Sequence, residues 1–409
     1  MMEQWDIVIV GGGAAGLLAA GAASRAGAKV LVLEKMHQVG RKLGIAGKGR
    51  GNLTNDKPVE LFVEGYRSGG EFLRGAFSRF FSRDLIELLE KRQVPCVVER
   101  GGRVFPQSGK ALDVVNALYR YARGEGGAVR TETEVRAIDA LEKGFLLQLA
   151  GGRIQANRLI LATGGKSYPR TGSTGDGFRF ASRLGHKLTP PRPALVPLSI
   201  DNPQAPLKIL LHNVGVTLLD GKRKVAAGFG EALLENTSLG GAVPVDLSYQ
   251  ALDLADPVIS LDFKPALDPA QLDARLRRDL EKDGRAPLQN VLNGLLPQAI
   301  IPLFVSRLQL DPRQRCAEVG KVTRTALGKL CKDLRFAVTG NRGWDEALVT
   351  AGGVVLDEVD PRTMASRVCP GLYLCGEVLD VDGVTGGYNL QAAFSTGFVA
   401  GEAAAERAR

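Results

Sequence analysis

The chain has 409 residues, of which 44% are hydrophobic and 24% charged, and its formal net charge is +9 at pH 7. This balance is typical of a globular protein, and the length predicts two or three domains. Five cysteines without a Cys-x-x-Cys pair argue against a disulfide framework and against zinc, so no metal site is expected. The positive charge leaves two interpretations open: a solvated basic surface, or a surface for an anionic partner such as nucleic acid.

The N-terminus predicts a strand and a turn rather than a targeting segment. Residues 1–5 carry no basic region, and three glycines, residues 11–13, interrupt the apolar run that starts at Ile7. No stretch of about 18 apolar residues follows, so the sequence predicts neither a transmembrane helix nor a membrane partner. A cytoplasmic location is therefore the expectation.

The first elements form a βαβ unit. Asp6–Val10 is an apolar strand, residues 16–26 are an Ala- and Leu-rich helix that ends at Gly27, and Lys29–Leu33 is a second strand. This order is typical of the doubly wound parallel sheet of Rossmann-like α/β domains.

A Gly-x-Gly-x-x-Gly motif lies between the first strand and the helix. Gly11 makes the tight turn, Gly13 lets the backbone approach a pyrophosphate, and Gly16 lets the helix pack on the strand. The N–H groups at the start of the helix, at Ala14 and Ala15, are free to bind phosphate. The motif in this context predicts dinucleotide binding.

Glu34 follows the second strand, 18 residues after the last glycine of the motif. Its carboxylate is placed to accept hydrogen bonds from a ribose 2′-OH, and it disfavours a 2′-phosphate. NADP is therefore not expected in this pocket.

The later elements divide the chain into four parts. Residues 36–70 have no clear period and predict a loop, and the proline-rich segment 188–206 predicts a boundary. Residues 207–264 alternate as antiparallel strands do, and residues 268–335 have helical periodicity. Further helices are predicted over 77–93, 111–123, 174–184 and 389–408, a hairpin over 95–105, and strands over 128–137, 145–149, 153–154, 158–162, 349–356 and 372–375. The expected organisation is an FAD-binding domain over 1–190 and 337–409, interrupted by a β-barrel-like domain over 191–265 and a basic helical domain over 266–336.

Two further segments favour FAD over NAD. Leu159–Gly165 resembles the Ala-Thr-Gly segment of two-dinucleotide-binding flavoproteins, and Gly371–Glu377 resembles their late strand, with Glu in place of Asp to bind the ribityl chain. The helix after Gly386–Gln391 would direct its N–H groups at the flavin N1/O2 edge. The residues expected to contact FAD in these segments and elsewhere are Ala162, Thr163, Gly164, Gly376, Glu377, Asn389, Leu390, Lys35, Arg41, Lys42 and Val135. No second complete Gly-x-Gly-x-x-Gly unit occurs, so NAD(P)H either docks transiently or another donor reduces the flavin.

Four longer motifs make the resemblance specific. The chain resembles the aminoacetone-oxidase or bile-acid-reductase-type flavoproteins, often called BaiN-like, over nearly its whole length. The motifs are residues 40–55, Gly102–Pro106, Ser167–Gly177 and Glu377–Gly383 continuing to Gly401. The resemblance implies a discontinuous FAD domain with inserted β-barrel-like and helical domains. It also implies flavin redox chemistry on small amines, on enones or on a uridine of large-subunit ribosomal RNA.

Two departures bear on catalysis. Where the family usually has Cys after Gly-x-Gly-Arg, this chain has Gly51, which excludes a catalytic thiol there. Where the family tends to carry Thr-His-Phe-Gly-x-Ser-Gly-Pro, this chain has Glu235–Ala242 and no histidine. The candidates for proton transfer are then Arg50, Lys48, Tyr168 and Tyr388, although each has an alternative role in binding or packing.

A basic helix over 318–335 carries the RNA hypothesis. Lys321, Arg324 and Lys332 fall on one face, and apolar residues including Val322 and Leu334 fall on the other. A reductase forming dihydrouridine in ribosomal RNA would use this face for the phosphate backbone. Two alternatives stay open: a small-molecule flavin oxidase or reductase with a basic surface, and a non-catalytic flavin-containing RNA-binding or assembly protein.

Overall fold

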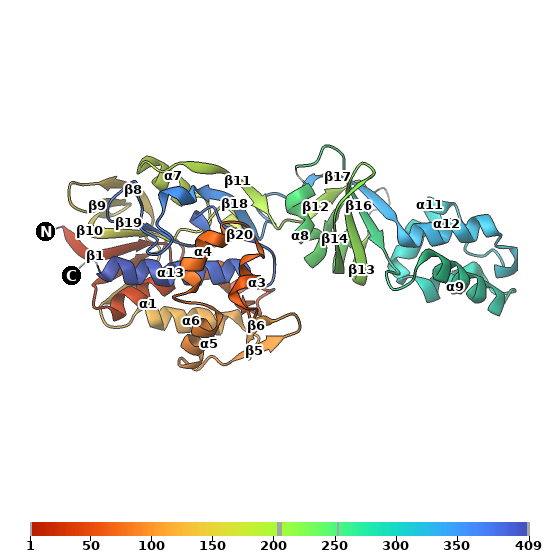
Figure 1. Ribbon diagram of the computed structural model, residues 1–409, viewed down its shortest axis with the longest axis horizontal. Helices are drawn as coiled ribbons and strands as arrows, with labels where there is room; N and C mark the ends of the chain where they lie inside the picture. The colour runs from red at the N-terminus through yellow and green to blue at the C-terminus, as the bar shows by residue number, and fades with distance from the viewer. Residues whose placement is uncertain (1, 203–206, 252, 407–409) are drawn as a thin grey trace. The chain divides into compact units, whose positions relative to one another are not determined.

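The computed structural model describes residues 2–202, 207–251 and 253–406. It divides the chain into two compact units (Figure 1): unit 1 comprises Met1–Ala194 with Ala347–Arg409, and unit 2 comprises Leu195–Glu346. The predicted β and helical insertions share unit 2, because the last strand of its barrel follows the helices in the chain. Parts of two sequence predictions, residues 203–206 of the proline-rich boundary and 407–408 of the last helix, lie outside the described residues.

A seven-stranded sheet forms the centre of unit 1 and confirms the predicted Rossmann-like fold. Its parallel part runs in the order β7 (Gly127–Arg130), β2 (Val30–Leu33), β1 (Glu3–Val10), β10 (Gly152–Leu161) and β19 (Leu372–Leu374). The strands β9 (Phe145–Leu149) and β8 (Val135–Ala140) extend it antiparallel beside β10. Ile7 and Ile9 of β1 are fully buried, as a central parallel strand requires.

Two glycines set the packing of the first helix against the last. The helix α1 (Ala14–Arg25) packs between α13 (Tyr388–Glu406) and α6 (Ala111–Ala122) (Figure 1). A Cβ on Gly397 would lie 2.3 Å from the carbonyl oxygen of Ala15, and one on Gly401 would lie 2.2 Å from that of Ala19. From the first contact to the second, the residue number rises by four in both helices, which is about one turn. The two helices therefore run parallel.

Residues 36–70 differ from the predicted loop. They form short elements, too brief to leave a periodic pattern: α2 (Arg41–Ile45), β3 (Thr54–Asn55), α3 (Val59–Val63), β4 (Tyr66–Ser68) and α4 (Gly70–Phe77). The helix predicted over 77–93 is therefore wrong in its bounds, and α5 (Ser82–Glu90) is a separate helix. Asp84 fixes the start of α5 after the end of α4, because its carboxylate accepts a hydrogen bond of 2.7 Å from the Phe81 N–H and caps α5.

The remaining elements of unit 1 lie beside the sheet. The predicted hairpin is confirmed as β5 (Cys96–Glu99) and β6 (Arg103–Pro106), and the strand predicted over 128–137 is two strands, β7 and β8. The helix α7 (Asp176–Arg183) is confirmed, and β11 (Leu188–Ala194) pairs with β18 (Val349–Val354). The two-residue strand β20 (Asp382–Gly383) pairs antiparallel with β4.

Unit 2 contains a closed barrel. Its strands, in order around the barrel, are β12 (Leu198–Ile200), β15 (Ser238–Gly240), β14 (Arg223–Glu235), β13 (Lys208–Asp220), β16 (Pro257–Asp262) and β17 (Leu334–Asn341). The barrel-like prediction is confirmed. The sequence did not predict α8 (Ala242–Ala251), which interrupts the β-rich segment before β16.

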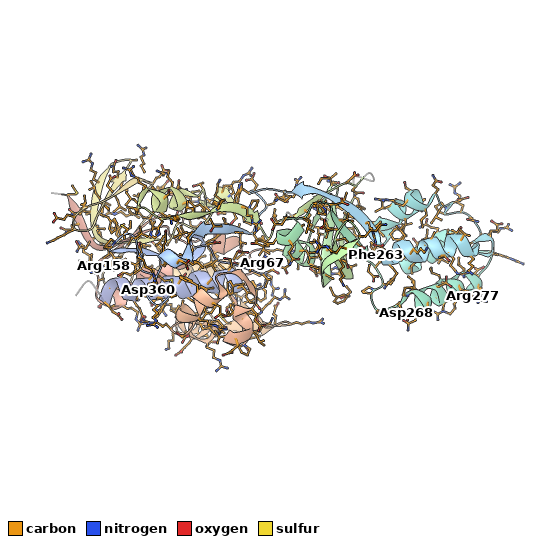
Figure 2. The ribbon with its side chains drawn as sticks, turned by 45° about the horizontal axis from the view of Figure 1, so that its top comes forward. Arg67, Arg158, Phe263, Asp268, Arg277 and Asp360 are labelled. Carbon is orange, nitrogen blue, oxygen red and sulfur yellow. The ribbon has the colours of Figure 1, made fainter. Side chains whose placement is uncertain are left out.

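Four α-helices lie between the barrel strands β16 and β17 in the chain: α9 (Pro269–Lys282), α10 (Leu288–Leu295), α11 (Ile301–Leu308) and α12 (Lys321–Lys332). Asp268 caps α9 by accepting a hydrogen bond of 2.8 Å from the Gln271 N–H, and Figure 2 labels Asp268 with Arg277 further along the helix. Barrel and helical residues, Phe263 and Phe304 among them, share one core. Among the described helices none is long and apolar enough to cross a membrane.

The helix predicted over 318–335 is wrong at both ends. It begins at Lys321, and Leu334 already belongs to the barrel strand β17. Val322 was placed on the apolar face, but 84% of its surface is exposed because it lies in the first turn, beyond the packed part of the helix.

Candidate flavin site

The N-terminus of α1 forms an open cradle. Gly13 precedes the helix with an extended backbone and no side-chain cap, and a Cβ added to it would meet nothing within 4 Å. Gly11 has φ +107°, and a Cβ there would lie 2.4 Å from the carbonyl oxygen of Ala162 at the end of β10. The first-turn N–H groups, at Ala14, Ala15 and Gly16, have no carbonyl partner within the helix. The cradle therefore offers N–H donors and space, which is what a pyrophosphate requires.

The carboxylate of Glu34 lies beside this cradle, at the end of β2. One oxygen accepts a hydrogen bond of 2.8 Å from the Gly12 N–H, and the other accepts one of 2.9 Å from the Met36 N–H. These bonds fix the carboxylate in place. Each carboxylate oxygen accepts up to two hydrogen bonds, so both remain able to accept from ribose hydroxyls.

A second acidic group, Glu377, is held by residues from three distant segments, which we call the Glu377 cluster. Lys42 forms an ion pair of 2.7 Å with one carboxylate oxygen. The hydroxyl of Ser167 and the N–H of Thr350 each donate a 2.7 Å hydrogen bond to the other oxygen. The side chains of Glu377 and Lys42 are 18% and 27% exposed, so the cluster is half-buried and reachable by a ligand.

Along the shared helix direction, α13 begins ahead of the N-terminus of α1. Gly397 packs on Ala15, and the helix begins nine residues earlier, at Tyr388. At about 1.5 Å per residue, α13 therefore begins about 14 Å before the first turn of α1, measured along the helix axis. Asn389 fixes the preceding loop, because its side-chain amide donates to the Gly383 carbonyl (2.8 Å) and accepts from the Gly383 N–H (2.9 Å).

Two buried oxygens without hydrogen-bond partners lie at this second helix start, Gln391 Oε1 in α13 and Thr54 Oγ1 beside it. A third, Asn52 Oδ1, lies two residues before Thr54 in the chain. Thr54 lies against α13, since a Cβ on Gly387 would be 2.5 Å from its carbonyl. Buried acceptors are normally satisfied, so these oxygens indicate a ligand or water that donates to them. A phosphate cradle at one end and polar groups at the other fit FAD.

The other residues predicted to contact FAD have varied surroundings. Lys35 forms a 2.6 Å ion pair with Asp176 at the start of α7, and the Arg41 guanidinium lies 3.3 Å from His37. Thr163 packs so closely on Gly177 that a Cβ there would lie 1.9 Å from its hydroxyl. Three more positions belong to the fold around the site: Gly164 in a left-handed turn, Leu390 partly buried in α13, and Val135 buried in β8.

The four candidates for proton transfer are not gathered into one cluster. Arg50 pairs with Glu99 and stacks 4.4 Å above the Phe105 ring, while Lys48 is exposed in a left-handed turn. Tyr388 is buried, and its ring stacks on Phe62 with centroids 4.3 Å apart. These contacts favour the binding or packing roles of Arg50 and Tyr388.

Tyr168 and Gly51 both occupy left-handed backbone. Tyr168 has φ +50° and precedes a 3₁₀ turn, Pro169–Thr171. Gly51 has φ +79°, and a Cβ there would lie 3.1 Å from the Ala111 Cα. A cysteine at this position would therefore have a strained backbone in this structure.

The basic residues proposed for RNA are largely paired within unit 2. Arg324 forms an ion pair of 2.9 Å with Asp273. Lys332 pairs with Asp262 at 2.6 Å and donates to two backbone carbonyls, those of Lys264 and Leu267. Of the three, Lys321 is the exposed one. Arg324 thus joins α12 to α9, and Lys332 joins α12 to the barrel strand β16.

Comparison with known families matches residues 5–403 to the HI0933-like protein Rossmann domain. The chain belongs to the HI0933-like family. Its sequence is 34% identical to a 3-dehydro-bile acid delta(4,6)-reductase of Clostridium scindens, over 98% of this chain and 99% of that protein. It is 31% identical to a ribosomal RNA dihydrouridine synthase of Escherichia coli, over 97% of this chain and 96% of that protein. The fold resembles the FrdA subunit of E. coli quinol fumarate reductase, with a TM-score of 0.50, 18% identity, and coverage of 100% of this chain and 71% of that one.

These findings confirm the predicted family. As a member of the HI0933-like FAD-binding family, the protein is an FAD-dependent oxidoreductase. Ser167, Thr350, Asn52 and Gln391 are further candidate site residues that the sequence prediction did not include. Ser167 and Asn52 stood in recognised motifs and gave a signal, whereas Thr350 lies on β18, whose pairing only the fold reveals.

Proposed function

We propose that the protein reduces a C=C bond conjugated with a carbonyl group in a small molecule. The observation that carries the proposal is the 34% identity, across nearly the whole chain, to a 3-dehydro-bile acid delta(4,6)-reductase. A 3-dehydro group is a ketone and delta(4,6) denotes double bonds, so that relative's name describes a conjugated enone. The match covers both the FAD-binding unit and the inserted unit with the barrel.

The residues of unit 1 would bind and orient the cofactor. The α1 cradle would hold the pyrophosphate, Glu34 the adenosine ribose, and the Glu377 cluster the ribityl hydroxyls. The N–H groups at the start of α13 would stabilise negative charge on the flavin N1/O2 edge. When bound, FAD supplies hydride chemistry at its ring. The sequence predicts no built-in NAD(P)H-binding domain, so an external donor would reduce the flavin. NADH and NADPH are the first donors to test.

A uridine in ribosomal RNA is the second candidate substrate, favoured by the 31% identity to a dihydrouridine synthase. The ion pairs of Arg324 and Lys332 weaken the original case for an RNA-binding helix face. A charge reversal at Lys332 would disturb unit 2 itself, so the RNA test needs the exposed Lys321. Lys321→Glu should leave the unfolding temperature unchanged, and a loss of RNA binding in that variant would support the RNA substrate.

The discriminating experiment has an anaerobic arm and an aerobic arm. Without oxygen, the FAD-loaded protein is reduced chemically, then mixed separately with a steroid enone and an unmodified ribosomal RNA transcript; in air, the oxidised protein is mixed with aminoacetone. We expect oxidised-flavin absorbance to return with the enone, with gain of two hydrogens in the product by mass spectrometry. Return with RNA alone, together with dihydrouridine, would replace the first candidate by the second. Turnover of aminoacetone by the oxidised protein with oxygen would identify an oxidase instead.

A further inference from the structure

One buried carboxyl group in unit 1 is left without hydrogen bonds. The Asp382 side chain is 1% exposed, and neither of its oxygens has a hydrogen-bond partner. Nη1 of Arg67 lies 3.8 Å from Oδ2, beyond hydrogen-bonding distance. Glu34 and Glu377 differ, because both oxygens of each accept hydrogen bonds. A carboxylate with a purely structural role would be satisfied in the same way.

Asp382 lies next to the start of α13. It forms β20 with Gly383, and β20 pairs with β4, the strand that carries Arg67 (labelled in Figure 2). Gly383 is hydrogen-bonded through both its N–H and its carbonyl to Asn389, the second residue of α13. The carboxyl group is therefore one residue from the loop that fixes the proposed flavin-binding helix start.

The charges around Asp382 come from three segments. Burial raises the pKa of Asp382 to about 6, Arg67 on β4 and Arg192 on β11 lower it, and Asp380 in the same loop raises it. Two tyrosines also lie beside Gly383: a Cβ built there would contact the Tyr66 ring and the Cβ of Tyr388. A further negative charge nearby would favour the protonated carboxyl, because little solvent is present to screen it.

We propose that Asp382 is a proton-holding residue of the flavin site, whose carboxylate takes one proton from solvent when the bound flavin gains two electrons. The proton returns to solvent, or leaves with the reduced product, when the flavin is oxidised again. The inference rests on the proposed function in placing the flavin ring at the start of α13. It leaves the identity of the substrate open.

The test is the midpoint potential of the bound flavin as a function of pH, measured without substrate. Each proton taken up with two electrons changes the equilibrium constant tenfold per pH unit, which is about 30 mV per pH unit. In the wild-type protein the plot should steepen by this amount as pH rises through about 6, because Asp382 is then ionised only in the oxidised protein. Asp382→Asn should lack the additional slope, and it breaks no hydrogen bond of the described residues.

Two neighbouring variants give opposite, predicted shifts. Arg67→Met removes a cation, so the steeper segment should begin at a higher pH, whereas Asp380→Asn should make it begin at a lower pH. If both variants and Asp382→Asn retain the wild-type plot, the proposal is wrong even though FAD binds. If the protein does not bind FAD, the cofactor assignment fails first, and the two failures are thus distinguishable.

Discussion

At the scale of single residues, Glu377 is the acid on which FAD affinity should depend most. Its carboxylate joins Lys42, Ser167 and Thr350, which come from three separate segments. Glu377→Gln keeps the shape but removes the charge that strengthens these bonds. FAD should bind about 10- to 100-fold more weakly, in line with one or two charged hydrogen bonds lost.

Fluorescence titration of the apoprotein with FAD measures this change. Glu402→Gln is a suitable control, because Glu402 pairs with Arg79 on the surface, away from the cluster. Equal FAD affinity for Glu377→Gln and the wild type would show that Glu377 does not contact the cofactor.

The pH dependence of stability should depend on His186. Its side chain is fully buried, with Nδ1 3.0 Å from Glu358 and Nε2 2.8 Å from the Ser366 hydroxyl. Burial lowers the pKa of His186, although Glu358 opposes this. The unfolded state therefore binds the proton more readily, and stability should fall as pH decreases below about 6.5, the usual histidine pKa.

Urea unfolding across this pH range measures the effect in wild type and His186→Asn. The variant should show a flatter profile below about pH 6.5. His212→Asn provides the control, since His212 also pairs with a glutamate, Glu231, but is exposed on β13. An unchanged profile in His186→Asn would contradict the assignment.

At the scale of elements, the parallel contact of α1 and α13 fixes the distance between the two helix starts. Gly397→Ala would place a Cβ 2.3 Å from a backbone carbonyl, so the helices must separate. We expect a loss of about 1–3 kcal/mol in the free energy of unfolding, together with weaker FAD binding. Gly294→Ala in α10 is the matched control, because its Cβ would meet nothing within 4 Å. That variant should gain about 0.5–1 kcal/mol. Equal stabilities would disprove the close contact.

Sequence patterns predicted the elements that repeat a period and missed those that do not. The βαβ unit, the hairpin before Pro106 and the last helix follow from glycine positions and apolar spacing. The short elements between Arg41 and Ser68 have too few residues for a period to emerge. The same limit applies to the site: Glu34, Glu377 and Asp382 stand in recognisable motifs, but the strand pairings that place Thr350 and Asp382 beside distant segments could not be predicted from them.

At the scale of the whole molecule, the sequence of the FAD-binding unit is interrupted by an inserted unit, which contains a barrel and helices. Its two flavin-binding ends lie more than 300 residues apart in sequence and meet through α1 and α13. The net charge is +9, and several of the basic residues, including Arg324 and Lys332, form ion pairs with carboxylates. Charge alone therefore does not assign a nucleic-acid partner.

The most direct test of the central claim is an anaerobic single turnover. The fully reduced, FAD-loaded protein is mixed with one equivalent of a steroid enone, and flavin absorbance and product mass are followed together. We predict that one flavin is oxidised for each C=C bond reduced, with the carbonyl retained. Flavin that stays reduced with the enone, and is reoxidised only when oxygen is admitted, would contradict it.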